Sequence, residues 1–459
     1  MRQQLTVGLV ASLLAFGCGD DDDTMSDMDG GPLPVDASDV DLGTDSGVDS
    51  GMTTGDGNDS FDTATPATLG TAIEDGVIDP AGDLDYYSFE GEAGQWIAIT
   101  TSANPDDDPE MVDTVLTLFD SSMTQIAEND DSIPRTDTDS EIFTRLPSAG
   151  TYYVLVQEFS TWADDTPEGM ESFAYELLIA EIDPDAVAVT LDAEGGDDVG
   201  SAQTLRYNVS ANGDFGLLIG ELRDGSDVDV FSFNVSDSKP FPRFTVLPSG
   251  SDGNGSSAMP SAVWVTDAAG TEIIGRIDPS ALQDLSPGVP TGEYRLWVEH
   301  GGSAGANDFY TLKAFRFTSD NPPEMNDTLN DVAATAETLT LEDDDEDGIF
   351  TAFVLAQVGD GDTDFFSIDV TDAAHVVSVF CGSRSAGSGV IDLEAALTDA
   401  TGVTLIDSAT ESATEGLALE EVAVSAAGTH LVRLTKDSQD GEVTGTWARC
   451  GVAVGPPAP

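Results

Sequence analysis

Short runs in which apolar and polar residues alternate recur along the chain, and one of them occurs three times. Residues 83–89, 227–233 and 362–368 read DLDYYSF, DVDVFSF and DTDFFSI, so two acids one residue apart precede an alternating pattern. Because successive side chains on a strand point to opposite faces, Tyr87 and Phe89 would share one inward side, as would their counterparts in the other copies. The pattern predicts three equivalent β-strands, each preceded by an acidic turn.

Three further patterns recur in every copy and in the same order. The first ends in an aspartate and a tight turn, the second begins at a glycine turn, and the third closes the copy. They lie at 116–120, 263–267 and 396–399; at 149–156, 291–298 and 427–434; and at 175–179, 310–315 and 446–452. Many short strands separated by turns, with few helical patterns, favour antiparallel two-sheet sandwiches. The spacing of the copies, 227−83=144 and 362−227=135 residues, matches the size of a small domain.

A short apolar run at the N-terminus predicts export. Residues 1–4 carry one charged side chain, and the apolar run at 5–17 is too short to span a bilayer. Residues 14–18, LAFGC, resemble the lipobox of bacterial lipoproteins, in which the cysteine is lipidated and becomes the mature N-terminus. This resemblance implies a signal peptide at 1–17 and acyl chains on Cys18 that anchor the protein in the bacterial envelope, at the outer membrane or the cell surface. Ordinary signal cleavage beside a chance cysteine is the alternative.

The segment at 18–56 is expected to be a disordered acidic tether. It consists largely of Asp, Gly, Ser and Thr, with few apolar side chains. Such a segment buries too little surface to offset the entropy of ordering it, and its charges repel one another. It would serve as a stalk between membrane and domains, or only as a solubilising tail.

The charge balance excludes one class of partner. The chain has 15 Lys and Arg residues against 87 Asp and Glu, a formal net charge of −72. A surface of this sign repels phosphate backbones, so nucleic acid is excluded as a partner. It also repels itself, which makes divalent cations expected companions.

Of the three cysteines, Cys381 and Cys450 remain as a pair if Cys18 carries lipid. Both lie in the third copy beside strand-like residues, and an exported protein favours a disulfide between them. A thiol pair for metal binding or catalysis is the competing interpretation, although neither cysteine has a histidine near it in sequence.

The first copy carries further residues that point to a known family. They are Asn-Asp-Ser at 58–60, Asp120, Asn-Asp-Asp at 129–131 and Gly-Thr-Tyr-Tyr at 150–153, besides the strand at 83–89. With them the copy resembles the bacterial pre-peptidase C-terminal domain, a jelly-roll β-sandwich found beside the catalytic domains of secreted peptidases and related to the collagen-binding domains of clostridial collagenases.

The other two copies resemble the family less closely. The third keeps Glu-Met-Asn-Asp at 324–327, and the second has Glu-Gly-Gly-Asp-Asp at 194–198 in place of the Asn-Asp pair. The resemblance implies an all-β chain of three tandem jelly-roll-like antiparallel sandwiches after the tether. We expect them at 57–182, 194–318 and 321–453, with short linkers after Ile182 and Thr318.

Calcium sites are a second implication of the resemblance. In the collagenase relatives, acidic and Asn residues at the start of the domain bind calcium together with aspartates ahead of the shared strand, because calcium prefers several hard oxygen ligands. Carried over by position, the ligands would be Asp56, Asn58, Asp59, Asp83 and Asp85 in the first copy, and Glu324, Asn326, Asp327, Asp362 and Asp364 in the third. The second copy lacks the Asn, which puts its site in doubt. Capping of turns by these side chains is the alternative.

The sequence offers no recognisable catalytic machinery. It contains no Gly-x-Ser-x-Gly, His-Glu-x-x-His or phosphate-binding glycine motif. Its three histidines, at 300, 375 and 430, are far apart, and His430 occupies the place of a strand tyrosine in the other copies.

The expected function is therefore non-enzymatic. We expect a lipid-anchored envelope protein whose tandem sandwiches bind or organise an extracellular polysaccharide or protein, with calcium as a stabilising cofactor. An accessory or degenerate subunit of a secreted peptidase or hydrolase is the alternative.

Overall fold

The computed structural model describes the chain from residue 57 to residue 457, with gaps. The described residues are 57–103, 112–130, 139–192, 196–210, 213–221, 223, 227–236, 238–239, 241–289, 291–300, 307–317, 330–341, 348–359, 362–411, 416–439, 443, 445 and 447–457. The predicted signal peptide, Cys18, the predicted tether and the predicted ligands Asp56, Glu324, Asn326 and Asp327 lie outside them.

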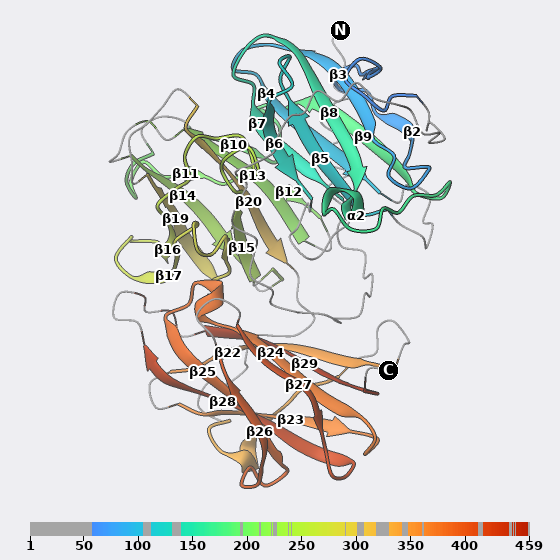
Figure 1. Cartoon of the computed structure of the whole chain (residues 1–459). Coiled ribbons are helices and arrows are strands. Elements are labelled where there is room, and N and C mark those ends of the chain that lie inside the picture. The colour runs from blue at the N-terminus through green and yellow to red at the C-terminus, as the bar shows by residue number, and fades with distance from the viewer. Residues whose placement is uncertain are drawn as a thin grey trace.

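The described residues form three sandwiches of two sheets each, stacked from the N-terminal to the C-terminal end of the chain (Figure 1). The first sandwich has one sheet in the order β1-β3-β8-β5-β6 and a second in the order β2-β9-β4-β7. Their bounds are β1 Thr65–Pro66, β2 Ile73–Val77, β3 Asp85–Gly91, β4 Trp96–Ser102, β5 Thr114–Phe119, β6 Gln125–Asn129, β7 Glu141–Arg145, β8 Gly150–Glu158 and β9 Ala174–Glu181, with the short helix α2 at Phe159–Trp162.

The second sandwich repeats this arrangement. Its sheets have the orders β11-β14-β19-β16-β17 and β10-β13-β20-β15-β18, with β12 paired to β13. The bounds are β10 Val189–Leu191, β11 Gln203–Thr204, β12 Asn208–Val209, β13 Gly213–Glu221, β14 Val228–Val235, β15 Phe241–Val246, β16 Ala262–Asp267, β17 Ile273–Ile277, β18 Asp284–Leu285, β19 Gly292–Glu299 and β20 Phe309–Phe317.

The third sandwich has the orders β21-β23-β28-β25-β26 and β22-β29-β24-β27. The bounds are β21 Glu337–Thr338, β22 Phe350–Gln357, β23 Asp364–Val370, β24 Val376–Gly382, β25 Val390–Asp399, β26 Leu405–Thr410, β27 Leu417–Ala423, β28 Gly428–Gln439 and β29 Trp447–Gly455, with short 3₁₀ turns η1 at Ala333–Thr335 and η2 at Arg384–Ala386. The prediction of an all-β chain of tandem sandwiches is confirmed.

The recurring acidic phrase marks the same strand in each sandwich, as the sequence predicts. β3, β14 and β23 each stand second in their sheet, between a short parallel strand and a long antiparallel one. The inward side chains of these strands are buried, and each sandwich has its own apolar core. The prediction from strand alternation that these side chains point inward is therefore correct.

The aspartate that ends β16 and β25, or follows β5, caps a tight turn. Oδ1 of Asp120, Asp267 and Asp399 accepts two or three backbone N–H groups from residues two to five positions farther along the chain. The third residue after each aspartate has a positive φ: Gly270 (72°), Gly402 (71°) and, in the first copy, Met123 (65°). Glycine takes this conformation without strain, whereas Met123 is held in it by the capped turn.

The first and second sandwiches share a small apolar core. The sequence predicts only a short linker between them, after Ile182. Ala98, Phe143 and Ile182 from the first pack with Val189, Leu217 and Ile219 from the second. The segment after Ile182 continues into β10, which pairs with β13 of the second sandwich. The two sandwiches are therefore joined by packing as well as by the chain.

Candidate cation centres

The opening segment of each sandwich is attached at an equivalent point. The carbonyl oxygens of Asn58, Gly196 and Asn330 accept the backbone N–H of Tyr86, Val230 and Phe365, at 3.0, 2.8 and 3.0 Å. Seven residues later each segment enters the short parallel strand β1, β11 or β21. These three residues, rather than Asn58 and Asn326, are therefore the structural equivalents.

An aspartate follows each of these three residues. Asp59, Asp197 and Asp331 thus come to the same end of their sandwiches as the acids that precede β3, β14 and β23. The chain has an Asn-Asp pair at both 326–327 and 330–331, and the sequence analysis chose the first. Only the hydrogen bond from Phe365 identifies the second pair as the equivalent.

Carboxylates gather most closely in the second sandwich. One oxygen each from Asp197, Asp227 and Asp229 lies within 4.8 Å of the others, and this is the one such group of three potential metal ligands among the residues the structure describes. Asp229 is buried, Asp227 is half-buried and Asp197 is exposed, so the group spans from core to surface. The sequence analysis doubted this site because it lacks an Asn, yet the aspartates converge without one.

Electrostatics at this group favour a cation. Burial raises the pKa of Asp229 to about 7, and the charges of Asp192 and Asp227 add to the rise, while the hydrogen bond from Tyr310 and the charge of Arg223 oppose it. Arg223 lies 3.7 Å from Asp192 and is the one cation among these groups. Hard carboxylate oxygens in this arrangement fit Ca²⁺, which prefers oxygen ligands of this kind.

The first sandwich binds its two phrase acids as the second does, where Oδ2 of Asp227 accepts the N–H of Arg223 at 2.9 Å. Asp83 is buried and caps a turn, since its Oδ2 accepts the N–H of Asp79 at 3.1 Å and its Oδ1 accepts that of Leu84 at 3.1 Å. Asp85 is the buried first residue of β3 and accepts a hydrogen bond from the hydroxyl of Tyr175. The predicted ligands Asn58 and Asp59 lie beside this strand start, but the described acids do not form a group of three like that of the second sandwich.

The third sandwich again uses its first acid as a turn cap. Oδ2 of Asp362 accepts the N–H of Gly359 at 3.2 Å, and Oδ1 accepts that of Thr363 at 2.9 Å. Asp364 is fully buried. The turn-capping alternative is thus realised for the first acid of all three copies, Asp83, Asp227 and Asp362, a role that these side chains can combine with cation binding.

The second acid of the phrase has a partner that the sequence analysis missed. The Tyr310 hydroxyl donates to Oδ2 of Asp229 at 2.7 Å, as Tyr175 does to Asp85. Each tyrosine faces a glycine across the sheet, Gly220 or Gly76, and a Cβ on that glycine would lie 2.2 or 2.4 Å from the tyrosine ring. The detectable signal is a glycine seven residues before the first acid, in both copies.

The third sandwich has lost this unit. At the corresponding place in its second sheet, Ala356 pairs with Ala448. Alanine stands in place of the tyrosine and of the glycine. The loss of the tyrosine ring frees the space that the added methyl group needs. The environment of Asp364 therefore differs from that of Asp85 and Asp229.

The histidines do not form a relay in the described part of the chain. His300 is buried and neither of its ring nitrogens has a hydrogen-bond partner there, and the same holds for Nδ1 of His375. His430 lies on β28 and its Nδ1 is 2.9 Å from the carbonyl oxygen of Gly428. No helix among the described residues is long and apolar enough to cross a membrane.

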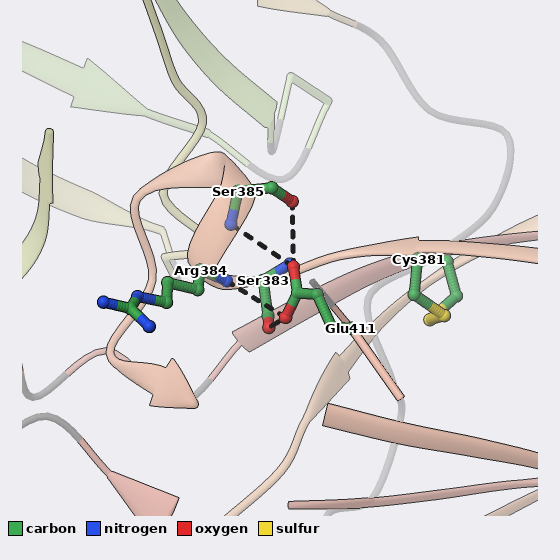
Figure 2. The surroundings of a disulfide bond; sticks show 6 residues. Cys381, Ser383, Arg384, Ser385 and Glu411 are labelled. Carbon is green, nitrogen blue, oxygen red and sulfur yellow. Dashed lines mark hydrogen bonds between the residues drawn. A yellow bond between two sulfur atoms is a disulfide. The ribbon is translucent and has the colours of Figure 1, made fainter. Parts of the chain in front are cut away.

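Cys381 and Cys450 are joined by a disulfide, the pairing expected from the sequence. They are direct partners on β24 and β29, with Cα atoms 4.1 Å apart. Beside them the buried carboxylate of Glu411 accepts the N–H of Ser383 at 2.7 Å and the hydroxyl of Ser385 at 2.8 Å, which fixes the η2 turn (Figure 2). This turn contacts the second sandwich, because Gly387 accepts the N–H of Arg276 at 2.8 Å.

Known proteins resemble the chain in part. Among solved structures it is similar to the pre-peptidase C-terminal domain of a collagenase from Bacillus anthracis, at 19% identity, covering 25% of this chain and 93% of that one, with a TM-score of 0.19. It is also similar to tripeptidyl peptidase 2, at 8% identity over 81% of this chain and 33% of that one, with a TM-score of 0.18. The CUB1-EGF-CUB2 region of human MASP-1/3 matches at 9% identity over 54% of this chain and 99% of that one, with a TM-score of 0.16.

No curated protein matches the chain. One family model does, and it describes the bacterial pre-peptidase C-terminal domain. The match covers residues 83–158, from the acidic turn before β3 to the last residue of β8. Over residues 83–158 the first sandwich is thus similar in sequence to the bacterial pre-peptidase C-terminal domain.

Proposed function

We propose that this chain is a non-catalytic, lipid-anchored protein of the bacterial envelope, whose tandem sandwiches bind or organise an extracellular polysaccharide or protein. The observation that carries the proposal is the threefold use of one sandwich topology, with the pre-peptidase C-terminal match in the first copy. Modules of this family accompany secreted peptidases, and the signal-like N-terminus and the disulfide fit an exported chain.

Calcium is the proposed stabilising cofactor. Its support is the carboxylate group of Asp197, Asp227 and Asp229, together with a net charge of −72 that a bound cation would reduce. A cation that binds only the folded chain stabilises it by mass action.

Tandem copies suit a repetitive ligand. The first two sandwiches are held against each other by a shared core. The distance between equivalent surfaces on the two sandwiches is therefore fixed. A polymer with regular repeats can then engage both, and the second contact adds avidity without a new kind of site.

Two experiments test this function. Binding to envelope polysaccharide and to secreted proteins is measured by pull-down with calcium and with chelator, and a ligand retained by the chain supports the proposal. Fractionation of cells that express Cys18→Ala tests the anchor, because the variant should leave the membrane fraction. A variant that stays with the membrane would contradict lipidation at Cys18.

An accessory or degenerate subunit of a secreted peptidase or hydrolase is the second candidate. The family match favours it, because pre-peptidase C-terminal domains accompany catalytic domains. Co-purification of a peptidase whose activity depends on this chain would select this candidate over an independent binding protein.

A further inference from the structure

The first sheet of each sandwich ends in an equivalent strand. β6, β17 and β26 are the last strands of these sheets, and each pairs with its neighbour through a β-bulge. The extra residue of the bulge is Ile126, Ile274 or Ile406. Two residues farther along stand Glu128, Arg276 and Ser408. These three residues are therefore equivalent, and their backbone N–H groups point to the open side of the sheet.

On the first sandwich this position receives the second sandwich. The N–H of Glu128 donates to the carbonyl oxygen of Gly253 at 3.0 Å, and Gly253 lies in the loop between β15 and β16. The same loop approaches β6 closely at a second point, since a Cβ on Gly255 would lie 2.9 Å from the carbonyl oxygen of Ile126. The end strand of the first sandwich is thus covered by a loop of the next one.

On the second sandwich the equivalent position receives the third sandwich. The N–H of Arg276 donates to the carbonyl oxygen of Gly387 at 2.8 Å, and Gly275 forms an isolated antiparallel bridge with Ser388. Gly387 lies between β24 and β25, which hold the places of β15 and β16 in their sheets. The turn before Gly387 is the η2 turn that Glu411 fixes beside the disulfide (Figure 2). The two junctions therefore repeat one head-to-tail contact.

The end strand of the third sandwich receives no further sandwich among the described residues. β26 is largely exposed, and Leu405 at its start is 56% exposed. Open N–H and C=O groups at the edge of a sheet are a template for pairing with another chain. The segment at 400–410 is rich in residues that favour strands, and Asp407 is its one charged residue.

Asp407 makes the hydrogen bond that the other two end strands use to hold the next sandwich. Its Oδ1 accepts the N–H of Ser408 at 2.8 Å. The side chain therefore takes the place that a carbonyl oxygen of the next sandwich has in the first two copies. The residues at the position of Asp407 in those copies are Ala127 and Gly275, and neither has a side-chain acceptor.

We propose that Asp407 closes the series of sandwiches at β26 and keeps this edge from pairing with the same edge of a second copy of the chain. Two such edges can pair antiparallel about a twofold axis, because each brings the same open backbone groups. The bond between Asp407 and Ser408 has to break before another chain can use the Ser408 N–H. The carboxylate also repels an approaching chain, whose net charge is −72.

Sedimentation velocity of the full chain tests this role of Asp407, with Cys18→Ala in every chain to remove the proposed lipid. The parent chain should stay monomeric at about 1–100 µM, whereas Asp407→Thr should associate at least tenfold more tightly. Threonine removes both the acceptor and the charge, and it favours a strand. Asp407→Asn should remain monomeric, because its side-chain oxygen can still accept the Ser408 N–H.

Asp369→Thr is the matched control. It removes an exposed carboxylate from β23 of the same sandwich, a strand that is paired on both sides, and it should leave the chain monomeric. Circular dichroism and thermal melting confirm that each variant is folded.

Amide hydrogen exchange locates the contact, since association of the Asp407→Thr chain should add protection in β26. An Asp407→Thr chain that stays monomeric, or that associates without new protection in β26, overturns the proposal. The same conclusion follows if the parent, Asp369→Thr or Asp407→Asn associates as strongly as Asp407→Thr.

Discussion

At the scale of single residues, the aspartates of two recurring sequence patterns take different roles. Asp120, Asp267 and Asp399 cap exposed turns through backbone N–H groups, whereas Asp227 and Asp229 stand with Asp197 in a group that has a buried member. The capped acids have a lowered pKa and Asp229 has a raised one. The direction of the shift thus separates an exposed acid whose anion is stabilised by hydrogen bonds from one whose anion is disfavoured chiefly by burial.

The acidic group of the second sandwich should respond to calcium. Calcium at a tenfold excess over its dissociation constant should stabilise the second sandwich by about 1.4 kcal/mol, and Asp227→Asn should remove that gain. Scanning calorimetry of the full chain measures it, in calcium, in magnesium and in chelator. Asp185→Asn, at an exposed position outside the group, is the matched control. Equal shifts for calcium and magnesium in all variants would exclude a specific site.

The turn cap at Asp399 should make the free energy of unfolding fall at low pH. Hydrogen bonds from Thr401 and Thr404 hold the pKa of Asp399 below its ordinary value. The folded pKa is below the unfolded one, so this contribution is complete above about pH 4 and is lost as the pH falls further. Asp399→Asn cannot protonate and should flatten the fall in stability between about pH 4 and pH 2, measured by urea unfolding. Asp369→Asn, exposed on β23, should leave the slope unchanged.

At the scale of elements, one strand order around the acidic phrase serves two kinds of interior. β3 and β14 carry an aspartate bonded to a tyrosine of the second sheet, and the tyrosine fits because it faces a glycine. In the third sandwich Ala356 and Ala448 replace glycine and tyrosine together. The topology therefore tolerates either solution, provided that both partners change.

A double-mutant cycle tests the coupling of Gly220 and Tyr310. The new Cβ of Gly220→Ala would lie 2.2 Å from the tyrosine ring, and such overpacking should cost about 1–3 kcal/mol. The same substitution in a Tyr310→Ala background should cost much less, because the ring is gone. Urea unfolding of the four chains gives the interaction energy, and strict additivity would show that the two residues are independent.

At the scale of the whole molecule, the first two sandwiches are packed together through a shared apolar core. The ion pair of Glu141 and Lys313 is buried between them, with side chains 8% and 3% exposed. A charge that loses its buried partner is strongly destabilising, whereas replacing both partners with apolar groups is often neutral. The junction is therefore a sensitive point of the fold.

Lys313→Met should lower the stability of both sandwiches by about 3–5 kcal/mol, because Glu141 is left buried without its partner. Amide hydrogen exchange measures the loss strand by strand. Protection should fall in β4 and β7 of the first sandwich as well as in β13 and β20 of the second. The double variant Glu141→Leu with Lys313→Met should recover most of it. Loss confined to the second sandwich would show that the two do not unfold together.

The sequence alone was sufficient for the β class, the repeat and the strand that carries the acidic phrase. Strand alternation is a local property, so Tyr87, Phe231 and Phe366 could be assigned to the core without knowing their neighbours. The pairing of Cys381 with Cys450 was also expected from the sequence, because the third cysteine, Cys18, was assigned to the predicted lipobox.

Only the tertiary structure decided which acids meet and which faces are covered. Asp197 reaches Asp227 and Asp229 because the opening segment is bonded through the Gly196 carbonyl, a contact that needs no particular side chain and leaves no motif. Asn330 rather than Asn326 is equivalent to Asn58 for the same reason. The shared core around Phe143 depends on sheets of two different sandwiches meeting face to face, and long-range packing of this kind has no local signal.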